Sequence, residues 1–201
     1  NKGKKYFMAV SNIVTTMCGS VVNPDDYTSA LEKHNVTYRF HIDGAYGGFV
    51  YPFSNQKSNI NFSNPKISSI TIDAHKMLQA PYGTGVFVCR KGLIENVLTK
   101  EAEYVEGMDL TLCGSRSGAN AVAVWMILFT YGAYGWFEKV SILQMRTQFL
   151  CNELDKLNIN YFREPFMNIV TIHAESIPEK IAEKYDLVPQ QHNENNKWYK
   201  I

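Results

Sequence analysis

Four strand-like runs, separated by polar and turn-forming segments, dominate the first half of the 201-residue chain. Their lengths and residue types are typical of buried strands, at residues 6–14, 38–42, 69–72 and 84–89. Pro24 and the two aspartates after it mark the start of a helix that is predicted to run to about His34. Residues 52–66 are rich in Asn, Ser and Pro, which predicts a loop. This order of elements predicts an α/β domain with a mostly parallel sheet.

Helical patterns follow in the second half. Residues 119–130 are predicted to form a strongly apolar helix and 134–157 a long amphipathic one, whereas 101–113 have mixed polarity and are predicted to be a long loop. Beyond them, short strands surround one further helix, at 161–163, 168–173, 178–185 and 198–201. We therefore divide the chain into a first unit, 1–135, and a segment, 136–201, that contains a linking helix and the start of a smaller α/β unit.

Composition and charge narrow the functional classes. The chain is 45% hydrophobic and 19% charged with a net charge of +1, so no basic excess favours nucleic acid or an anionic membrane. No apolar run reaches the roughly 18 residues of a membrane-spanning helix, and the first residues lack the apolar core of a signal peptide. The four scattered cysteines predict neither a disulfide framework nor a metal site, which favours a reducing, cytoplasmic setting. Because the chain does not begin with Met and its ends lie close to predicted strands, we expect a piece of a longer polypeptide.

Asp43 follows a predicted strand and precedes several small residues, in His-Ile-Asp-Gly-Ala-Tyr-Gly-Gly at 41–48. In α/β sheets, ligands bind outside the carboxyl ends of the strands. An aspartate at that position is able to face a ligand, and the glycines permit a close backbone approach. An aspartate that only caps a turn is an equally good interpretation of this spacing.

Lys76 stands at the end of another predicted strand, in Ser-Ile-Thr-Ile-Asp-Ala-His-Lys-Met at 69–77. Most single lysines are solvated surface residues, but the apolar flanks of Lys76 predict burial. Burial lowers the pKa of a lysine, which suits Schiff-base chemistry.

A third polar segment, Gly-Ser-Arg-Ser-Gly-Ala-Asn-Ala at 114–121, leads into the apolar helix and places Arg116 where it is able to bind a carboxylate or phosphate. Arg116 is equally well interpreted as a structural residue beside a serine helix cap.

Four motifs occur along the chain. In order they are His-Ile-Asp-Gly-Ala-Tyr-Gly-Gly at 41–48, Asp-Ala-His-Lys-Met at 73–77, Ala-Pro-Tyr-Gly-Thr-Gly at 80–85 and Gly-Ser-Arg-Ser-Gly at 114–118. Together they resemble the group II pyridoxal-phosphate decarboxylases, which include the glutamate, aromatic amino acid and tyrosine/aspartate decarboxylases. The 33 positions between Asp43 and Lys76 are similar to the spacing in this family. The resemblance covers nearly the whole chain. It implies an aspartate-aminotransferase-like (fold type I) α/β fold, with 1–135 as the C-terminal part of the large cofactor domain and 136–201 as the start of the small one.

The resemblance also implies roles for individual residues. Lys76 resembles the lysine that forms the Schiff base with pyridoxal 5'-phosphate, and Asp43 the acid that pairs with the pyridine nitrogen. Ala45 resembles the small residue against one face of the ring, and His75 the histidine on the phosphate side. Thr15 and Thr16 are similar to a Thr-Thr pair near the ring oxygen.

The same resemblance implies the reaction. An L-amino acid loses carbon dioxide and leaves the amine, through a quinonoid intermediate whose electrons the protonated pyridine ring accepts. Tyr104 resembles a loop tyrosine that returns a proton to the substrate, although a packed loop tyrosine is an equal alternative. Arg116 is a candidate for binding the substrate carboxylate. Val14 replaces the glycine that precedes the two threonines in the family, which weakens the assignment of Thr15 and Thr16.

Other functions remain open at this point. The sphingosine-phosphate lyases share a similar Asp-x-His-Lys and Gly-Ser-Arg pattern, an aminotransferase uses the same cofactor, and a truncated remnant would act only as an interaction partner. The Ala-Pro-Tyr-Gly-Thr-Gly segment favours the decarboxylases over the lyases. The resemblance further implies a homodimer with a shared active site and a phosphate-binding segment upstream of residue 1, and it leaves the amino-acid substrate open.

Overall fold

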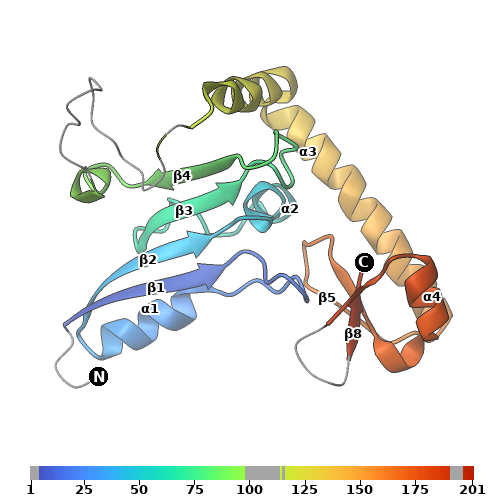
Figure 1. The fold of residues 1–201 in the computed structure, drawn as a ribbon. Coiled ribbons are helices and arrows are strands. Elements are labelled where there is room, and N and C mark those ends of the chain that lie inside the picture. Colours follow the sequence, from blue (N-terminus) through green and yellow to red (C-terminus); the bar gives the residue numbers. More distant parts are fainter. Residues whose placement is uncertain (1–4, 98–113, 115, 191–196) are drawn as a thin grey trace.

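The computed structural model describes residues 5–97, 114, 116–190 and 197–201. Its larger sheet has the order β1-β2-β3-β4 (Figure 1). The strands are β1 (Tyr6–Asn12), β2 (Thr37–Asp43), β3 (Ile67–Asp73) and β4 (Gly85–Cys89). β1, β2 and β3 are parallel, and β4 is antiparallel to β3. The predicted α/β class and mostly parallel sheet are confirmed.

Side-chain alternation along β2 separates an apolar row of residues from a polar one. Phe40 and Ile42 of β2 are fully buried in the main core. Arg39, His41 and Asp43 alternate with them and therefore point to the opposite face. The polar row of β2 ends at Asp43, one of the candidate site residues.

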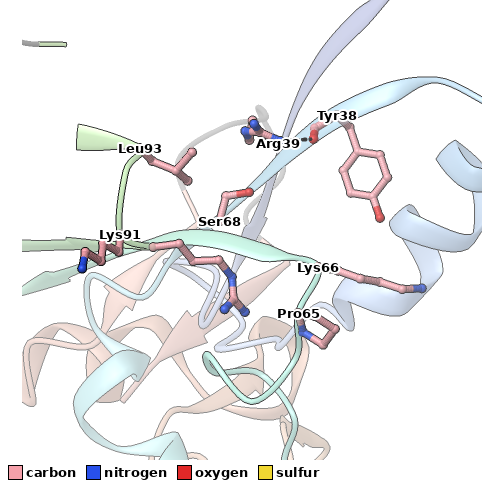
Figure 2. A pocket seen from close by; sticks show the side chains of 8 residues that line it. Tyr38, Arg39, Pro65, Lys66, Ser68, Lys91 and Leu93 are labelled. Carbon is pink, nitrogen blue, oxygen red and sulfur yellow. Dashed lines mark hydrogen bonds between the residues drawn. The ribbon is translucent and has the colours of Figure 1, made fainter. Parts of the chain in front are cut away.

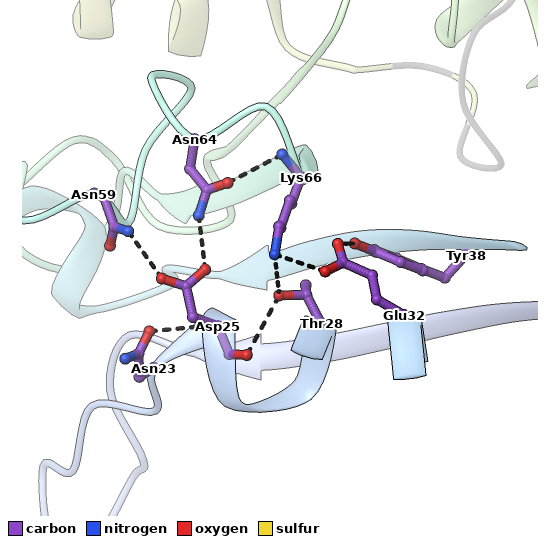
Figure 3. A network of polar contacts seen from close by, with 8 residues as sticks. All are labelled: Asn23, Asp25, Thr28, Glu32, Tyr38, Asn59, Asn64 and Lys66. Carbon is purple, nitrogen blue, oxygen red and sulfur yellow. Dashed lines mark hydrogen bonds and ion pairs between the residues drawn. The ribbon is translucent and has the colours of Figure 1, made fainter. Parts of the chain in front are cut away.

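Helix α1 (Pro24–Lys33) begins where Pro24 predicted, with the Asn23 side chain accepting a hydrogen bond from the Asp25 amide at 3.0 Å. A polar network joins this helix to the segment before β3 (Figure 3). Lys66 Nζ lies 3.0 Å from Glu32 Oε2, and the Tyr38 hydroxyl donates to Glu32 Oε1 at 2.8 Å. The Lys66 and Tyr38 hydrogen bonds lower the pKa of Glu32. Burial, followed by the bond to Glu32, raises the pKa of Tyr38 to about 12.

The segment after β2 turns tightly through the 3-10 helix η1 (Gly47–Phe49) into α2 (Tyr51–Ser54). The prediction of a loop over 52–66 is therefore wrong at its start, because Tyr51 is buried and draws one helical turn into the core. Gly47 approaches the chain after β1 so closely that a Cβ would lie 2.6 Å from the Ile13 carbonyl oxygen. This turn fixes the backbone that follows Asp43.

A short 3-10 helix, η2 (Ile94–Val97), follows β4, and α3 (Gly118–Lys156) then runs from the β4 side of the large sheet toward the second sheet (Figure 1). The two predicted helices are its two halves, separated at Gly132, which has φ 57° and ψ −175°. Positive φ favours glycine, so Gly132 permits the kink between them. Among the described residues, no helix is long and apolar enough to cross a membrane.

The second sheet is antiparallel, with the order β5-β6-β8-β7. Its strands are β5 (Tyr161–Arg163), β6 (Val170–His173), β7 (Val188–Pro189) and β8 (Trp198–Lys200). Two short helices, η3 (Ala174–Ser176) and α4 (Glu179–Lys184), lie between β6 and β7 in the chain. The sequence pattern missed β7, which has only two residues. Contacts tie this sheet to the loop after β1, such as the Val21 amide donating to Glu164 Oε2 at 3.2 Å. The division at residue 135 stays a prediction.

Candidate functional site

The candidate site lies at the carboxyl edge of the large sheet. Asp43 is the last residue of β2 and Asp73 the last of β3, and these strands are parallel neighbours. Thr15 and Thr16 follow β1, which is parallel to β2, so they leave the sheet at the same edge. Ligands in open α/β sheets bind in the crevice outside this edge.

Asp43 both caps a turn and faces this edge. Its Oδ1 accepts a hydrogen bond from the Ala45 amide at 3.0 Å, which is the turn-capping contact weighed as an alternative. Within the described part of the chain, no hydrogen bond or ion pair engages its Oδ2. The two interpretations of Asp43 are therefore compatible, since one oxygen holds the turn and the other is available to a ligand.

Lys76 forms an ion pair with Asp73, with Nζ 2.8 Å from Oδ2. The prediction that Lys76 is buried is wrong, because 40% of its side chain is exposed. After β3 the chain forms a turn rather than a further stretch of strand, so Ala74 and Leu78 point into the core while Lys76 points out. The apolar neighbours of Lys76 therefore do not surround it.

Hydrogen bonds connect the two predicted cofactor contacts through the backbone. The Ala45 amide binds the Asp43 carboxylate, and the Ala45 carbonyl accepts from the Asp73 amide at 3.0 Å. Asp73 in turn holds Lys76. An amine and a carboxylate are thus joined through two residues at one edge of the sheet.

His75 is held by Thr84, the residue before β4. The His75 amide and its Nδ1 lie 3.2 and 3.0 Å from the Thr84 carbonyl oxygen. Because a carbonyl only accepts, Nδ1 carries the proton in this contact. Nε2 lies 3.9 Å from Asp73 Oδ2, and the Tyr82 ring lies 5.3 Å away between centroids.

His41 is the first residue of the motif at 41–48, but no role in the site was predicted for it. Its Nδ1 lies 2.8 Å from Ser69 Oγ and its Nε2 3.1 Å from Thr71 Oγ1, so it joins β2 to β3. Burial lowers the pKa of His41, and the nearby Asp43 charge opposes that shift. The signal for this cluster was the alternation of polar residues along both strands.

The two threonines lie in the turn after β1. Thr15 Oγ1 accepts a hydrogen bond from the Ser20 amide at 3.1 Å, and the Thr16 carbonyl accepts from Lys200 Nζ at 3.2 Å. The structure thus places both at the candidate edge, with the Thr15 hydroxyl engaged in the turn. Their contact with a cofactor stays a prediction.

Arg116 lines a cavity of about 850 Å³ between the start of α3 and the chain from Gly83 to Phe87. Thr84 also lines this cavity, and Thr84 holds His75. Arg116 therefore lies on the His75 side of the candidate site. Tyr104, the predicted proton donor, lies outside the described residues.

A second cavity, of about 470 Å³, lies at the other end of the sheet (Figure 2). It is lined by cationic and polar side chains that include Arg39, Lys66, Arg90 and Lys91. Arg90 donates to three backbone carbonyls and thereby holds the turn before β3. Because this cavity opens at the amino ends of β2 and β3, it is separate from the candidate site.

Comparison with solved structures gives the class of the fold, that of fold type I pyridoxal-phosphate-dependent enzymes. Sphingosine-1-phosphate lyase from Burkholderia pseudomallei superposes with a TM-score of 0.77 at 18% identity, over 96% of this chain and 46% of that one. L-methionine decarboxylase from Streptomyces sp. 590 gives 0.74 at 16% identity, over 96% and 49%. At these identities the likeness concerns the fold alone.

The family follows from the sequence. The pyridoxal-dependent decarboxylase conserved domain matches residues 1–168, and the chain belongs to this family. It is 57% identical over 199 residues to tryptophan decarboxylase of Clostridium sporogenes, covering 99% of this chain and 48% of that protein. It is 33% identical over 174 residues to a probable L-tyrosine/L-aspartate decarboxylase of Methanocella arvoryzae, covering 85% and 46%. The chain thus spans just under half the length of these relatives, and the predicted family and cofactor, pyridoxal phosphate, are confirmed.

The residues at the carboxyl edge fit this cofactor. Lys76 would offer an amine to its aldehyde, Asp43 a carboxylate to its ring nitrogen, and Ala45 a side chain small enough to leave space for a ring. Among the described residues, no group of three His, Cys, Asp or Glu side chains has the arrangement of a metal site.

Proposed function

We propose that the protein to which this chain belongs removes the carboxylate of an L-amino acid as carbon dioxide, with pyridoxal phosphate held by Lys76. The observation that carries the proposal is the connection of Lys76 to Asp43 through Asp73 and Ala45 at one sheet edge, in a chain of the decarboxylase family. When bound, the cofactor supplies an aldehyde for amine capture and an electron acceptor for the bond that breaks.

Asp43 is proposed to keep the ring nitrogen of the cofactor protonated. A carboxylate next to a basic nitrogen favours the charged form of that nitrogen. The Ala45 amide binds one oxygen of Asp43, and the other oxygen is proposed to face the ring nitrogen. The proposal thus gives Asp43 an electrostatic role.

The other site residues keep the roles that the family implies. Ala45 is proposed to lie against the ring, His75 to lie on the phosphate side, and Thr15 and Thr16 to lie near the ring oxygen. Arg116, which lines the cavity beside His75 and Thr84, is proposed to bind the substrate carboxylate. Tyr104 is proposed to return the proton to the substrate.

We propose tryptophan as the first substrate to test, on the strength of the 57% identity to a tryptophan decarboxylase. The test is carbon dioxide release by the full-length protein from a panel of amino acids that includes tryptophan, tyrosine, aspartate and glutamate. We expect release from tryptophan, with tryptamine as the second product. Release from none of them, by a protein that has bound the cofactor, would contradict the proposal.

A lyase of the sphingosine-phosphate type is the second candidate, because the Burkholderia enzyme has the same fold. Its likeness is 18% in sequence, against 57% for the tryptophan decarboxylase. Formation of a long-chain aldehyde from a phosphorylated sphingoid base would favour the lyase.

The proposal also includes a homodimer and a cytoplasmic location. An apolar stripe on the first half of α3 supports the dimer: Val122, Trp125, Met126 and Phe129 share one side of the helix, and each is more than half exposed. Exposed apolar patches of this kind mark protein interaction sites. The cytoplasmic location rests on the scattered cysteines.

A further inference from the structure

The proposed function uses the ion pair between Lys76 and Asp73 to link the site residues, but it gives the Asp73 side chain no role of its own. Nζ lies 2.8 Å from Asp73 Oδ2, and 40% of the Lys76 and 30% of the Asp73 side chain are exposed. Exposed ion pairs contribute little to stability, because water screens them and two side chains lose freedom. The consequence of the contact is therefore geometric, since it fixes the position of the amine.

Asp73 is itself held on both sides. As the last residue of β3 it pairs with Gly85, its amide donates to the Ala45 carbonyl at 3.0 Å, and its carbonyl accepts from the Lys76 amide at 3.0 Å. The next residue, Ala74, is fully buried. The carboxylate thus projects from a rigid part of the sheet, whereas the long lysine side chain has many rotamers.

The two aspartates of this edge have separate partners. Asp43 binds the Ala45 amide, and among the described residues no ion pair joins Asp43 to Lys76. The other titratable group near Asp73 is His75, whose Nε2 lies 3.9 Å from the same oxygen that binds the lysine. Asp73 is therefore the described carboxylate that contacts the reactive amine.

We propose that Asp73 is a positioning residue for Lys76: its carboxylate holds the ammonium in place at the sheet edge until the lysine loses a proton to solvent water and reacts. The electron pair left on Nζ would then form the bond to the aldehyde carbon of the cofactor. The bond from that carbon to its oxygen would break, and the oxygen would leave as water with one proton from the amine and one from solvent. The inference rests on the proposed role of Lys76 as the lysine that captures the cofactor.

The test separates capture of the aldehyde from binding of the ring. Apo full-length protein is mixed with pyridoxal phosphate, and the rate constant of covalent capture is followed by visible absorbance. Affinity for pyridoxine 5'-phosphate, which has an alcohol in place of the aldehyde, is measured in parallel.

For Asp73→Asn we expect capture to slow by on the order of tenfold to a hundredfold, the effect of a misplaced reacting group, with unchanged affinity for pyridoxine phosphate. Asp73→Glu is expected to recover part of the rate, and Asp26→Asn, on the exposed surface of α1, to behave as wild type.

Each other outcome overturns a specific statement. Capture at the wild-type rate by Asp73→Asn contradicts the role of Asp73. Equal losses of capture and of pyridoxine phosphate affinity in both Asp73 variants indicate a structural role instead, which also contradicts it. Absence of covalent capture at Lys76 in the wild type contradicts the proposed function itself, together with the inference that depends on it.

Discussion

At the scale of single residues, the site depends on which neighbour each charged group contacts. Asp43 and Asp73 end adjacent strands, yet one binds a backbone amide and the other a lysine. The motifs were sufficient to single out Asp43 and Lys76. They did not predict the ion pair, because a contact between side chains depends on how the turn after β3 directs them. For the same reason the apolar flanks of Lys76 gave a wrong prediction of burial.

Asp43→Asn tests the electrostatic role at this scale. The amide retains a hydrogen-bond acceptor for the Ala45 amide but loses the charge. Because a neighbouring opposite charge changes a pKa by about 1 to 3, and each step corresponds to about tenfold, kcat is expected to fall by about tenfold to a thousandfold. Steady-state kinetics of the full-length variant, with the bound cofactor quantified, give the result. A variant that loads the cofactor and keeps wild-type kcat would rule out the assignment.

At the scale of elements, tight turns and cross-strand hydrogen bonds position the site. The predicted strands are all present, because their length and alternation dominate the pattern. The turn helix α2 and the short β7 were missed, since their few residues depend on tertiary contacts that no local pattern reports. The cluster of His41 with Ser69 and Thr71 had a local signal in the alternation of polar residues, but the contact itself depends on the pairing of β2 with β3.

Gly47→Ala is expected to destabilise the turn after Asp43. A Cβ there would lie 2.6 Å from the Ile13 carbonyl oxygen, which is backbone and cannot easily shift. Overpacking of this kind costs about 1–3 kcal/mol in the free energy of unfolding. Gly85→Ala is the matched control, because nothing lies within 4 Å of its Cβ position. Equal chemical denaturation midpoints for the two variants would show that the turn is not as tight as described.

Because of His41, the free energy of unfolding is expected to depend on pH. Burial lowers the pKa of the folded-state His41 below its usual 6.5. As pH falls below 6.5, the unfolded chain therefore binds a proton that the folded chain does not, and the free energy of unfolding decreases. His41→Gln, which is able to bond both hydroxyls without titrating, is expected to lose less stability between about pH 8 and about pH 5. The same loss in both proteins, measured by urea denaturation, would refute the contribution of His41.

At the scale of the whole molecule, the candidate site occupies one edge of a sheet in a chain that spans just under half the length of its relatives. The exposed stripe on α3 lies outside the three buried hydrophobic clusters of the described residues, with Trp125 and Phe129 stacked at 5.2 Å between ring centroids. The sequence predicted a strongly apolar helix at 119–130, and a partner surface would explain why its apolar side chains are exposed.

Phe129→Glu in the full-length protein tests the proposed dimer. Phe129 is 77% exposed, so the charge is tolerated in an isolated subunit but is costly within an apolar interface. We expect sedimentation to shift from dimer toward monomer. Tyr185→Glu on α4, where the side chain is 62% exposed, is expected to leave the association unchanged. A Phe129→Glu protein that remains fully dimeric would place the interface elsewhere.

The central claim is that Lys76 is the lysine that holds pyridoxal phosphate. The most direct measurement is borohydride reduction of the cofactor-loaded full-length protein, followed by mass spectrometry of its peptides, because reduction makes the bond between lysine and cofactor permanent. The account predicts a phosphopyridoxyl group on Lys76 in the wild type and none at that position in Lys76→Ala. A phosphopyridoxyl group on a different lysine, or on none, would contradict it.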